Sequence, residues 1–186
     1  HYVVFSKNPG YNAFSKARDK SIRGIFVVRK DSEINELKSL NDSTLAFPAP
    51  AAFAASILTR AALVKNSVKF TPKYVSSHDS VYRTVAKGIY PSGGGVVRTF
   101  NNVAPEIRSQ LKILWTSKGY TPHAIASHPR VDVSTVKVIQ TALIEMEYQP
   151  SGKKLLQEIK IQGFEAGSDS DWNDVRSLGL NLINLD

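Results

Sequence analysis

The chain contains no cysteine, so neither a disulfide nor a thiolate takes part in its stability or its chemistry. It also has no apolar run near the ~20 residues that a membrane-spanning helix requires. The first residue is His1, and no charged start followed by an apolar stretch comes after it. We therefore expect that a signal peptide, if the gene encodes one, has been removed from this sequence.

Several catalytic and metal-binding patterns are missing as well. There is no G-x-S-x-G nucleophile elbow, and the neighbours His78-Asp79-Ser80 cannot converge on one point from the start of a helix. Gly93-Gly94-Gly95 lacks the lysine and the strand-loop-helix context of a phosphate loop, so it predicts a permissive turn. His123 and His128 flank a predicted strand without the carboxylates or third histidine that a metal site needs. We expect no catalytic residues, no metal and no cofactor.

The composition predicts a folded protein that attracts small anions. With 186 residues, 42% of them apolar, the chain can bury a core of one domain or two small lobes. The formal net charge is +8, and its basic residues are spread along the chain rather than gathered into a run. This distribution predicts no nucleic-acid partner, because a general positive field that attracts small anions explains the positive net charge equally well.

Hydrophobic periodicity predicts alternating strands and helices. Strands are expected at Tyr2–Ser6, Gly24–Lys30, Thr44–Phe47, Lys73–Ser76, Gly95–Phe100, Ile113–Thr116 and His123–His128. Helices are expected at Asp31–Leu40, Ala51–Asn66, His78–Lys87, Pro105–Leu111, Val133–Glu147, Ser151–Ile159 and Asp169–Leu178. The βαβαβαβ order in the middle of the chain predicts a parallel sheet covered on both faces, with ligands at the carboxyl ends of its strands.

The segment Lys73 to Gly88, KYVSSHDSVYRTVAKG, predicts an anion site. A strand there ends in hydroxyl residues and opens directly into a helix, whose first N–H groups face outward with the positive end of the helix dipole. A second such corner follows Thr44–Phe47. We expect an oxyanion to bind near Ser76, Ser77 and His78 and near the amides of Ala52 and Phe53.

Three segments carry a resemblance to a known family: LAFPAPAAFAAS at 45–56, YVSSHDS at 74–80 and GGGVVRTFN at 93–101. Together they resemble periplasmic phosphate- and phosphonate-binding proteins of ABC transporters. The resemblance implies an α/β, two-lobed type 2 periplasmic binding fold that closes on a small oxyanion and delivers it to an ABC permease. It also implies a periplasmic or other extracytoplasmic location and no enzymatic activity. A ligand-sensing domain of a signalling protein and an enzyme on the same scaffold stay open as alternatives.

Individual residues transfer from the family only in part. Ser76, Ser77 and His78 match the family's hydroxyl and imidazole pattern at a strand end. The family also has a helix that starts with serine or threonine, and the matching position here reads Pro50-Ala51-Ala52-Phe53. Where relatives often place an acidic residue for a ligand amine, this chain has Arg98 and Thr99, which implies a preference for a second anionic group. The resemblance implies that a missing amino-terminal part of the chain contributes aromatic contacts. Within the sequence, Tyr11, Tyr120 and Trp115 are available to stack on a ligand; Trp115, in a predicted strand, is expected in the core instead, and Tyr11 is included in the site.

The resemblance also implies a division of the chain into lobes. Residues 1–27 and 123–186 correspond to a first lobe and residues 28–122 to a second one. Too few residues precede Gly24 to build a complete first lobe, so its amino-terminal part is expected to be missing. The apolar stripe Val136, Ile139, Leu143 and Met146 would then be exposed, and we expect upstream residues or a self-association partner to cover it.

Overall fold

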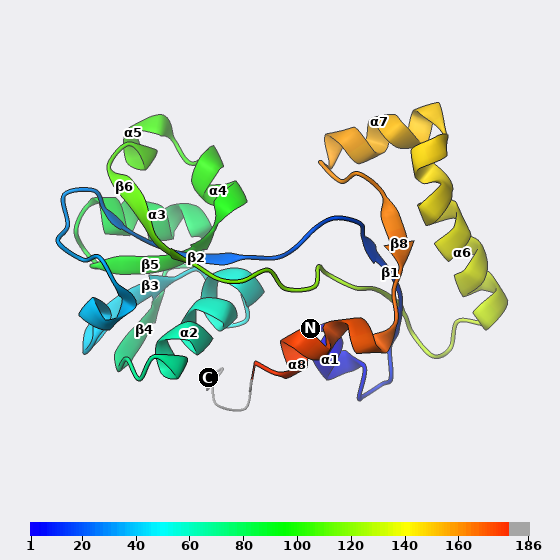
Figure 1. The fold of residues 1–186 in the computed structure, drawn as a ribbon, viewed down its shortest axis with the longest axis horizontal. Helices are drawn as coiled ribbons and strands as arrows, with labels where there is room; N and C mark the ends of the chain where they lie inside the picture. The colour runs from blue at the N-terminus through cyan, green and yellow to red at the C-terminus, as the bar shows by residue number, and fades with distance from the viewer. Residues whose placement is uncertain (179–186) are drawn as a thin grey trace. The chain divides into compact units, whose positions relative to one another are not determined.

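A computed structural model of the chain describes residues 1–178, which form two compact units (Figure 1). Unit 1 contains His1–Ile22 and Tyr120–Ser177, and unit 2 contains Arg23–Gly119 together with Leu178 among the described residues. The described chain thus passes between the units after Ile22, after Gly119 and after Ser177. The predicted lobe boundaries lie after residues 27 and 122, and the assignment of the units to an incomplete and a complete lobe stays a prediction.

Unit 2 is built on a five-stranded sheet with the order β4-β3-β5-β2-β6. The strands are β2 (Gly24–Arg29), β3 (Ser43–Phe47), β4 (Phe70–Tyr74), β5 (Ser92–Val96) and β6 (Leu111–Thr116). β3 is parallel to β4 and β5, but β2 runs antiparallel to both of its neighbours, so the expectation of a purely parallel sheet was wrong. The connection from β2 to β3 contains only the 3-10 turn η1 (Leu37–Leu40) and lacks the crossover helix that parallel strands need.

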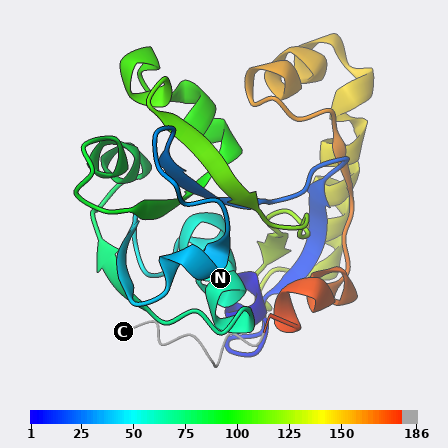
Figure 2. The same cartoon turned by 60° about the vertical axis from the view of Figure 1, so that its left-hand side comes forward.

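Helices cover both faces of this sheet (Figure 2). They are the π-helix η2 (Phe53–Leu58), α2 (Thr59–Lys65), α3 (His78–Ala86), α4 (Val97–Asn102) and α5 (Pro105–Arg108). On one face, Ile25 and Val27 of β2 pack with buried residues of α3, α4 and α5. On the other face, Phe26 packs with Phe47 and with Leu63 of α2. This alternation along β2 is the period-two pattern of a strand that is buried on both sides.

The three glycines predicted as a turn lie instead in the central strand β5. A Cβ atom built on Gly94 would stand 1.9 Å from the carbonyl oxygen of Ala55 in η2. On the opposite face, a Cβ on Gly93 would stand 2.4 Å from Val81, and one on Gly95 would stand 2.3 Å from the hydroxyl of Tyr82. The turn prediction was therefore wrong, because these glycines admit the close approach of a helix on each face of the sheet.

Two other predicted elements differ in the structure. Tyr2–Ser6 was expected to be a strand but forms the helical turn α1 (Tyr2–Phe5), in which the carbonyl of His1 accepts the N–H groups of Val4 and Phe5. The helix expected over Asp31–Leu40 is reduced to η1. Its first half is irregular because the Ser32 hydroxyl accepts the Ile34 N–H, an alternative to helical bonding that serine readily offers.

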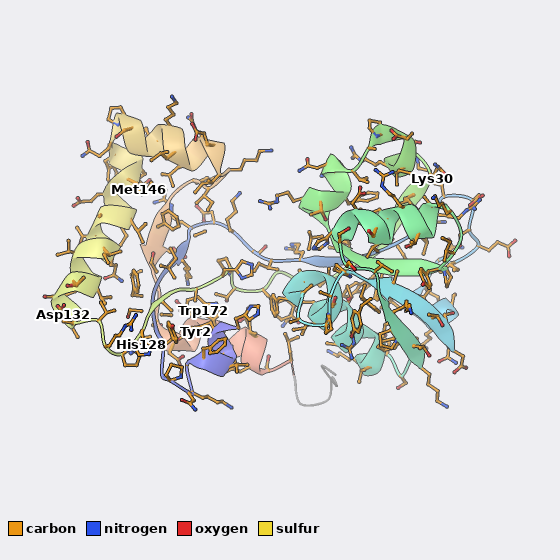
Figure 3. The ribbon with its side chains drawn as sticks, turned by 180° about the vertical axis from the view of Figure 1, so that it is seen from behind. Tyr2, Lys30, His128, Asp132, Met146 and Trp172 are labelled. Atoms are coloured by element: carbon orange, nitrogen blue, oxygen red, sulfur yellow. The ribbon has the colours of Figure 1, made fainter. Side chains whose placement is uncertain are left out.

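Unit 1 contains a three-stranded antiparallel sheet with the order β7-β1-β8. Its elements are β1 (Asn12–Ala17), β7 (Ile125–Ser127), β8 (Phe164–Ala166), α6 (Val133–Glu145), η3 (Met146–Tyr148), α7 (Pro150–Glu158), η4 (Asp169–Trp172) and α8 (Asn173–Arg176). The sequence reading missed β1 and β8. Trp172 is the largest buried side chain of the unit, and Figure 3 shows it beside Tyr2, with ring centroids 4.8 Å apart.

The helix α6 has no buried residue within the described part of the chain. Asp132 caps its first turn by accepting the Thr135 N–H, and Figure 3 shows Asp132 and Met146 at its two ends. Val133 and Val138 are each 70% exposed and Ile139 is 43% exposed. Of the predicted stripe, Ile139 is exposed and Val136, Leu143 and Met146 are partly buried, and what covers the stripe in solution stays a prediction. Among residues 1–178, no helix is both long and apolar enough to cross a membrane.

Candidate functional site

Three strand-to-helix corners lie at one edge of the unit 2 sheet. β4, β3 and β5 are consecutive in the sheet and parallel, with Phe47 opposite Tyr74 and Ala46 opposite Gly93. Their carboxyl ends therefore share one edge, and each strand is followed there by a helix. This is the edge at which open α/β sheets place their ligands.

The β4–α3 corner consists of Ser76, Ser77 and His78. Ser76 has a positive φ of 71°, a conformation that is uncommon for a residue with a side chain. Ser77 is the N-cap of α3, and its hydroxyl oxygen accepts the Ser80 N–H at 3.0 Å. The backbone N–H groups of His78 and Asp79 belong to the first turn, where a helix offers no acceptor of its own. The corner thus presents amide donors together with the side chain of His78.

The imidazole of His78 is half-buried, and its Nδ1 atom is inaccessible to solvent with no hydrogen-bond partner among the described residues. Burial lowers the pKa of His78 below its ordinary value, because it disfavours the charged imidazolium. The neighbouring Asp79 does not raise the pKa of His78 again, since its carboxylate is paired with Arg83. His78 is therefore a neutral imidazole near pH 7, with a buried nitrogen that is left unsatisfied.

The β3–η2 corner differs from its prediction in detail. The N–H of Ala52 donates to the carbonyl of Ala49 at 3.2 Å, so this predicted donor already has an acceptor. Phe53 begins the helix, which opens with a π-helical segment rather than an α-helix. Ser56 ties the segment back to the corner by donating its hydroxyl to the Ala49 carbonyl at 2.6 Å. π-Helical turns are rare and are found frequently at functional sites.

The β5–α4 corner carries the two remaining predicted residues of unit 2. Arg98 and Thr99 lie in the first turn of α4, not in a strand as predicted, because β5 ends at Val96. The Thr99 hydroxyl lies 2.7 Å from the Tyr82 hydroxyl and donates to the carbonyl of Val96. Thr99 thus fixes the corner internally. Arg98 is exposed, and no hydrogen bond or ion pair joins it to another described residue.

The net positive charge of the chain is concentrated in unit 2. Residues 23–119 contain fourteen lysines and arginines against six aspartates and glutamates, a balance of +8. Residues 1–22 and 120–177 contain ten against nine. The unit that holds the three corners therefore carries the whole excess, which favours the approach of anions to it.

Tyr11, the predicted aromatic contact, lies in unit 1, whereas the three corners belong to unit 2. Its ring makes edge contacts with His128 at 5.3 Å and with Phe5 at 6.3 Å between centroids. Tyr11 also lines a cavity of about 270 Å³ together with Tyr2, Phe5, Ala124 and Ala126.

Within residues 1–178, no group of three or more histidine, aspartate or glutamate side chains is placed to hold a metal ion.

Comparison with known protein families shows to which family the chain belongs. The sequence model described as "ABC transporter, phosphonate, periplasmic substrate-binding protein" matches residues 1–172. The chain belongs to this family. No curated protein matches its sequence. Proteins of the family are extracytoplasmic substrate-binding components of ABC transporters, and the family is one of transport proteins rather than enzymes.

Solved structures of low sequence identity share the fold. A chloride-bound protein of Xanthomonas citri is 15% identical, with a TM-score of 0.83 over 97% of this chain and 74% of that one. The PhnD1 protein of Prochlorococcus marinus, in complex with methylphosphonate, is 19% identical, with a TM-score of 0.76 over 94% and 72%. A binding protein of a phosphonate transporter from Pseudomonas aeruginosa is 17% identical, with a TM-score of 0.73 over 90% and 61%. These structures confirm the predicted periplasmic binding fold.

Proposed function

We propose that this member of the phosphonate-binding family binds phosphate, a phosphonate or a related small oxyanion and delivers it to an ABC permease. The observation that carries the proposal is the β4–α3 corner, where Ser77, the first-turn amides of α3 and the half-buried His78 lie at the ligand edge of the sheet. Family membership, the +8 balance of unit 2 and the methylphosphonate complex of the Prochlorococcus protein support it.

Each part of the corner has a distinct role in this proposal. The first-turn amides of α3 hold the oxyanion along the positive end of the helix dipole. The Ser77 hydroxyl, which accepts from Ser80, keeps a proton of its own that it can donate to the ligand instead of to the Ser80 hydroxyl. His78, in the first turn of α3, supplies a ring N–H to a ligand oxygen.

Substitutions at Ser77 test the site. Ser77→Ala removes one hydrogen bond to a charged ligand, and we expect the affinity for methylphosphonate to fall by about 10- to 150-fold, equivalent to ~1.5–3 kcal/mol. Ser77→Asp keeps an N-cap side chain but adds a negative charge, so it is expected to abolish binding while the thermal midpoint of the protein is preserved. Calorimetric titration with phosphate and methylphosphonate measures both effects.

The control for these variants is Ser109→Ala. Ser109 is an exposed serine that follows α5 and donates to the Glu106 carbonyl, so its loss removes a comparable hydroxyl far along the chain from the corner. Its titration curve is expected to match that of the unaltered protein. Unchanged affinity in Ser77→Ala, Ser77→Asp and His78→Asn together would place the ligand elsewhere.

The pH dependence of binding provides a second test. The pKa of His78 is lowered in the folded protein, so the imidazole is neutral in the free state, and a bound anion favours its protonation. We expect the affinity of the unaltered protein, divided by that of His78→Asn, to increase as the pH falls from 8 towards the ordinary histidine pKa of ~6.5. Because the ligand protonates equally in both titrations, the ratio cancels the effect of its protonation. A ratio that is constant over this range would show that His78 does not face the anion.

The same lowered pKa predicts the sign of a stability change. Because the folded protein binds the His78 proton less readily than the unfolded chain, its free energy of unfolding decreases as the pH falls through ~6.5. In the absence of ligand, His78→Asn is expected to flatten this part of the stability profile. Urea unfolding at several pH values, followed by fluorescence, measures the difference.

A further inference from the structure

Arg98 lies at the ligand edge and has no hydrogen-bond or ion-pair partner within residues 1–178. It occupies the second position of α4, directly after β5, and it is exposed. Other arginines of unit 2 have recorded contacts: Arg29 pairs with Asp31, Arg83 pairs with Asp79, and Arg108 lies over the ring of Phe100. Among the described residues, Arg98 has none of these contacts. A positive charge in the first turn of a helix is also at the unfavourable end of the helix dipole.

The position of Arg98 is fixed relative to His78. Tyr82 follows His78 by four residues in α3, so the two side chains share one face of the helix. The Tyr82 hydroxyl, which is buried, lies 2.7 Å from the Thr99 hydroxyl and accepts the Val96 N–H at 3.2 Å. The face of α3 that carries His78 is therefore the face that contacts the first turn of α4. This turn is held by hydrogen bonds on both sides of Arg98.

We infer that Arg98 is a specificity residue that selects ligands with a second anionic group, such as a phosphonocarboxylate. The inference rests on the proposed function, in which the first anionic group occupies the β4–α3 corner. β4 and β5 are two strands apart, about 10 Å, and an arginine side chain that extends from α4 covers most of that separation. Its guanidinium offers paired N–H donors that match a carboxylate or phosphate, whereas it repels the amine of an aminoalkylphosphonate.

Calorimetric titration with two ligands tests the inference. Methylphosphonate carries the phosphonate group alone, and phosphonoacetate adds a carboxylate to it. We expect the unaltered protein to bind phosphonoacetate at least about tenfold more tightly, as a charge-assisted contact predicts. Arg98→Gln is expected to remove this preference, while its affinity for methylphosphonate changes by less than about threefold, since removal of one exposed charge alters only the screened field.

Arg29→Gln is the control, because it removes one guanidinium, partly exposed and paired with Asp31, at the opposite end of the sheet. β2 runs antiparallel to β5, so Arg29 lies at its far end, away from the three corners. It should leave both affinities and the preference unchanged at constant ionic strength.

The outcomes separate the inference from the proposed function. Equal losses for both ligands in Arg98→Gln, or methylphosphonate binding that depends on Ser77 without any preference for phosphonoacetate, would overturn the inference alone. If the unaltered protein binds neither ligand, the proposed function fails and the inference fails with it.

Discussion

Replacing Gly94 by alanine is expected to disrupt the sheet of unit 2. The new Cβ would lie 1.9 Å from the backbone oxygen of Ala55 and 2.9 Å from the ring of Phe47. A backbone carbonyl cannot rotate away as a flexible side chain does, so either β5 or the π-helix η2 must move. Overpacking of this kind costs ~1–3 kcal/mol and occasionally more, and we expect a loss at the upper end of that range.

The two tryptophans of the chain make this effect measurable. Trp115 lies in β6 of unit 2 and Trp172 lies in unit 1, so Trp172→Phe leaves a fluorescence reporter of unit 2 alone. In that background, urea unfolding of Gly94→Ala should show an earlier transition than its parent. Gly163→Ala is the matched control, because its Cβ would meet only the ends of the Arg18 and Glu147 side chains, at 3.1 Å or more. Equal midpoints for the two alanine variants would refute the close packing of η2 on β5.

Periodicity predicted the elements of unit 2 where side chains carry the signal. β2 reads Ile25-Phe26-Val27-Val28, and α3 begins at a serine cap, so both were predicted within a residue of their observed bounds. The strand β5 was predicted too late in the sequence, at Gly95–Phe100, because its three glycines have no side chains and therefore give no alternating pattern. Its strand character comes from the tertiary approach of Tyr82 and Ala55, which no local pattern records.

The misplaced prediction of β5 also affected the predicted site. Because the predicted strand extended to Phe100, Arg98 and Thr99 were placed in a strand, although they lie in the first turn of a helix. The role of Tyr82 was missed entirely, since its partners Val96 and Thr99 are distant in the sequence. One signal was available: a tyrosine four residues after His78 shares its helix face and precedes a glycine strand that leaves room for its ring.

In unit 1, the missed strands have short or polar sequences. β8 is only Phe164–Ala166, and β1 contains the polar residues Asn12, Ser15 and Lys16. Both depend on pairing with each other and on side chains from the end of the chain, such as Asp171, which holds Lys16 at 2.9 Å. Strands that are stabilised by partners so remote in the sequence leave little hydrophobic pattern of their own.

Replacing Trp172 by alanine is expected to destabilise unit 1 strongly while unit 2 keeps its stability. Unit 1 has few buried apolar side chains among its described residues: Tyr120, Leu156, Trp172 and Val175. Trp172 is only 3% exposed, donates its indole N–H to the Pro122 carbonyl at 2.8 Å and contacts the ring of Tyr2. Its removal costs about 3–5 kcal/mol as a large-to-small core substitution. A unit of about 80 residues has a total stability of only ~4–12 kcal/mol, so this loss is a large share of it.

Hydrogen exchange followed by mass spectrometry distinguishes the two units. In Trp172→Ala, the amides of β1, β7 and β8 should exchange faster by several orders of magnitude, because each ~1.4 kcal/mol of lost stability raises the open population tenfold. The amides of β2 and β3 should retain their protection, since both hydrophobic clusters of unit 2 lie within residues 25–111. Trp172→Phe keeps an aromatic ring against Tyr2 but loses the bond to Pro122, and an intermediate increase is expected. Loss of protection in β2 and β3 to the same extent as in β1 would show that the two units unfold as one, contrary to the separation of their cores.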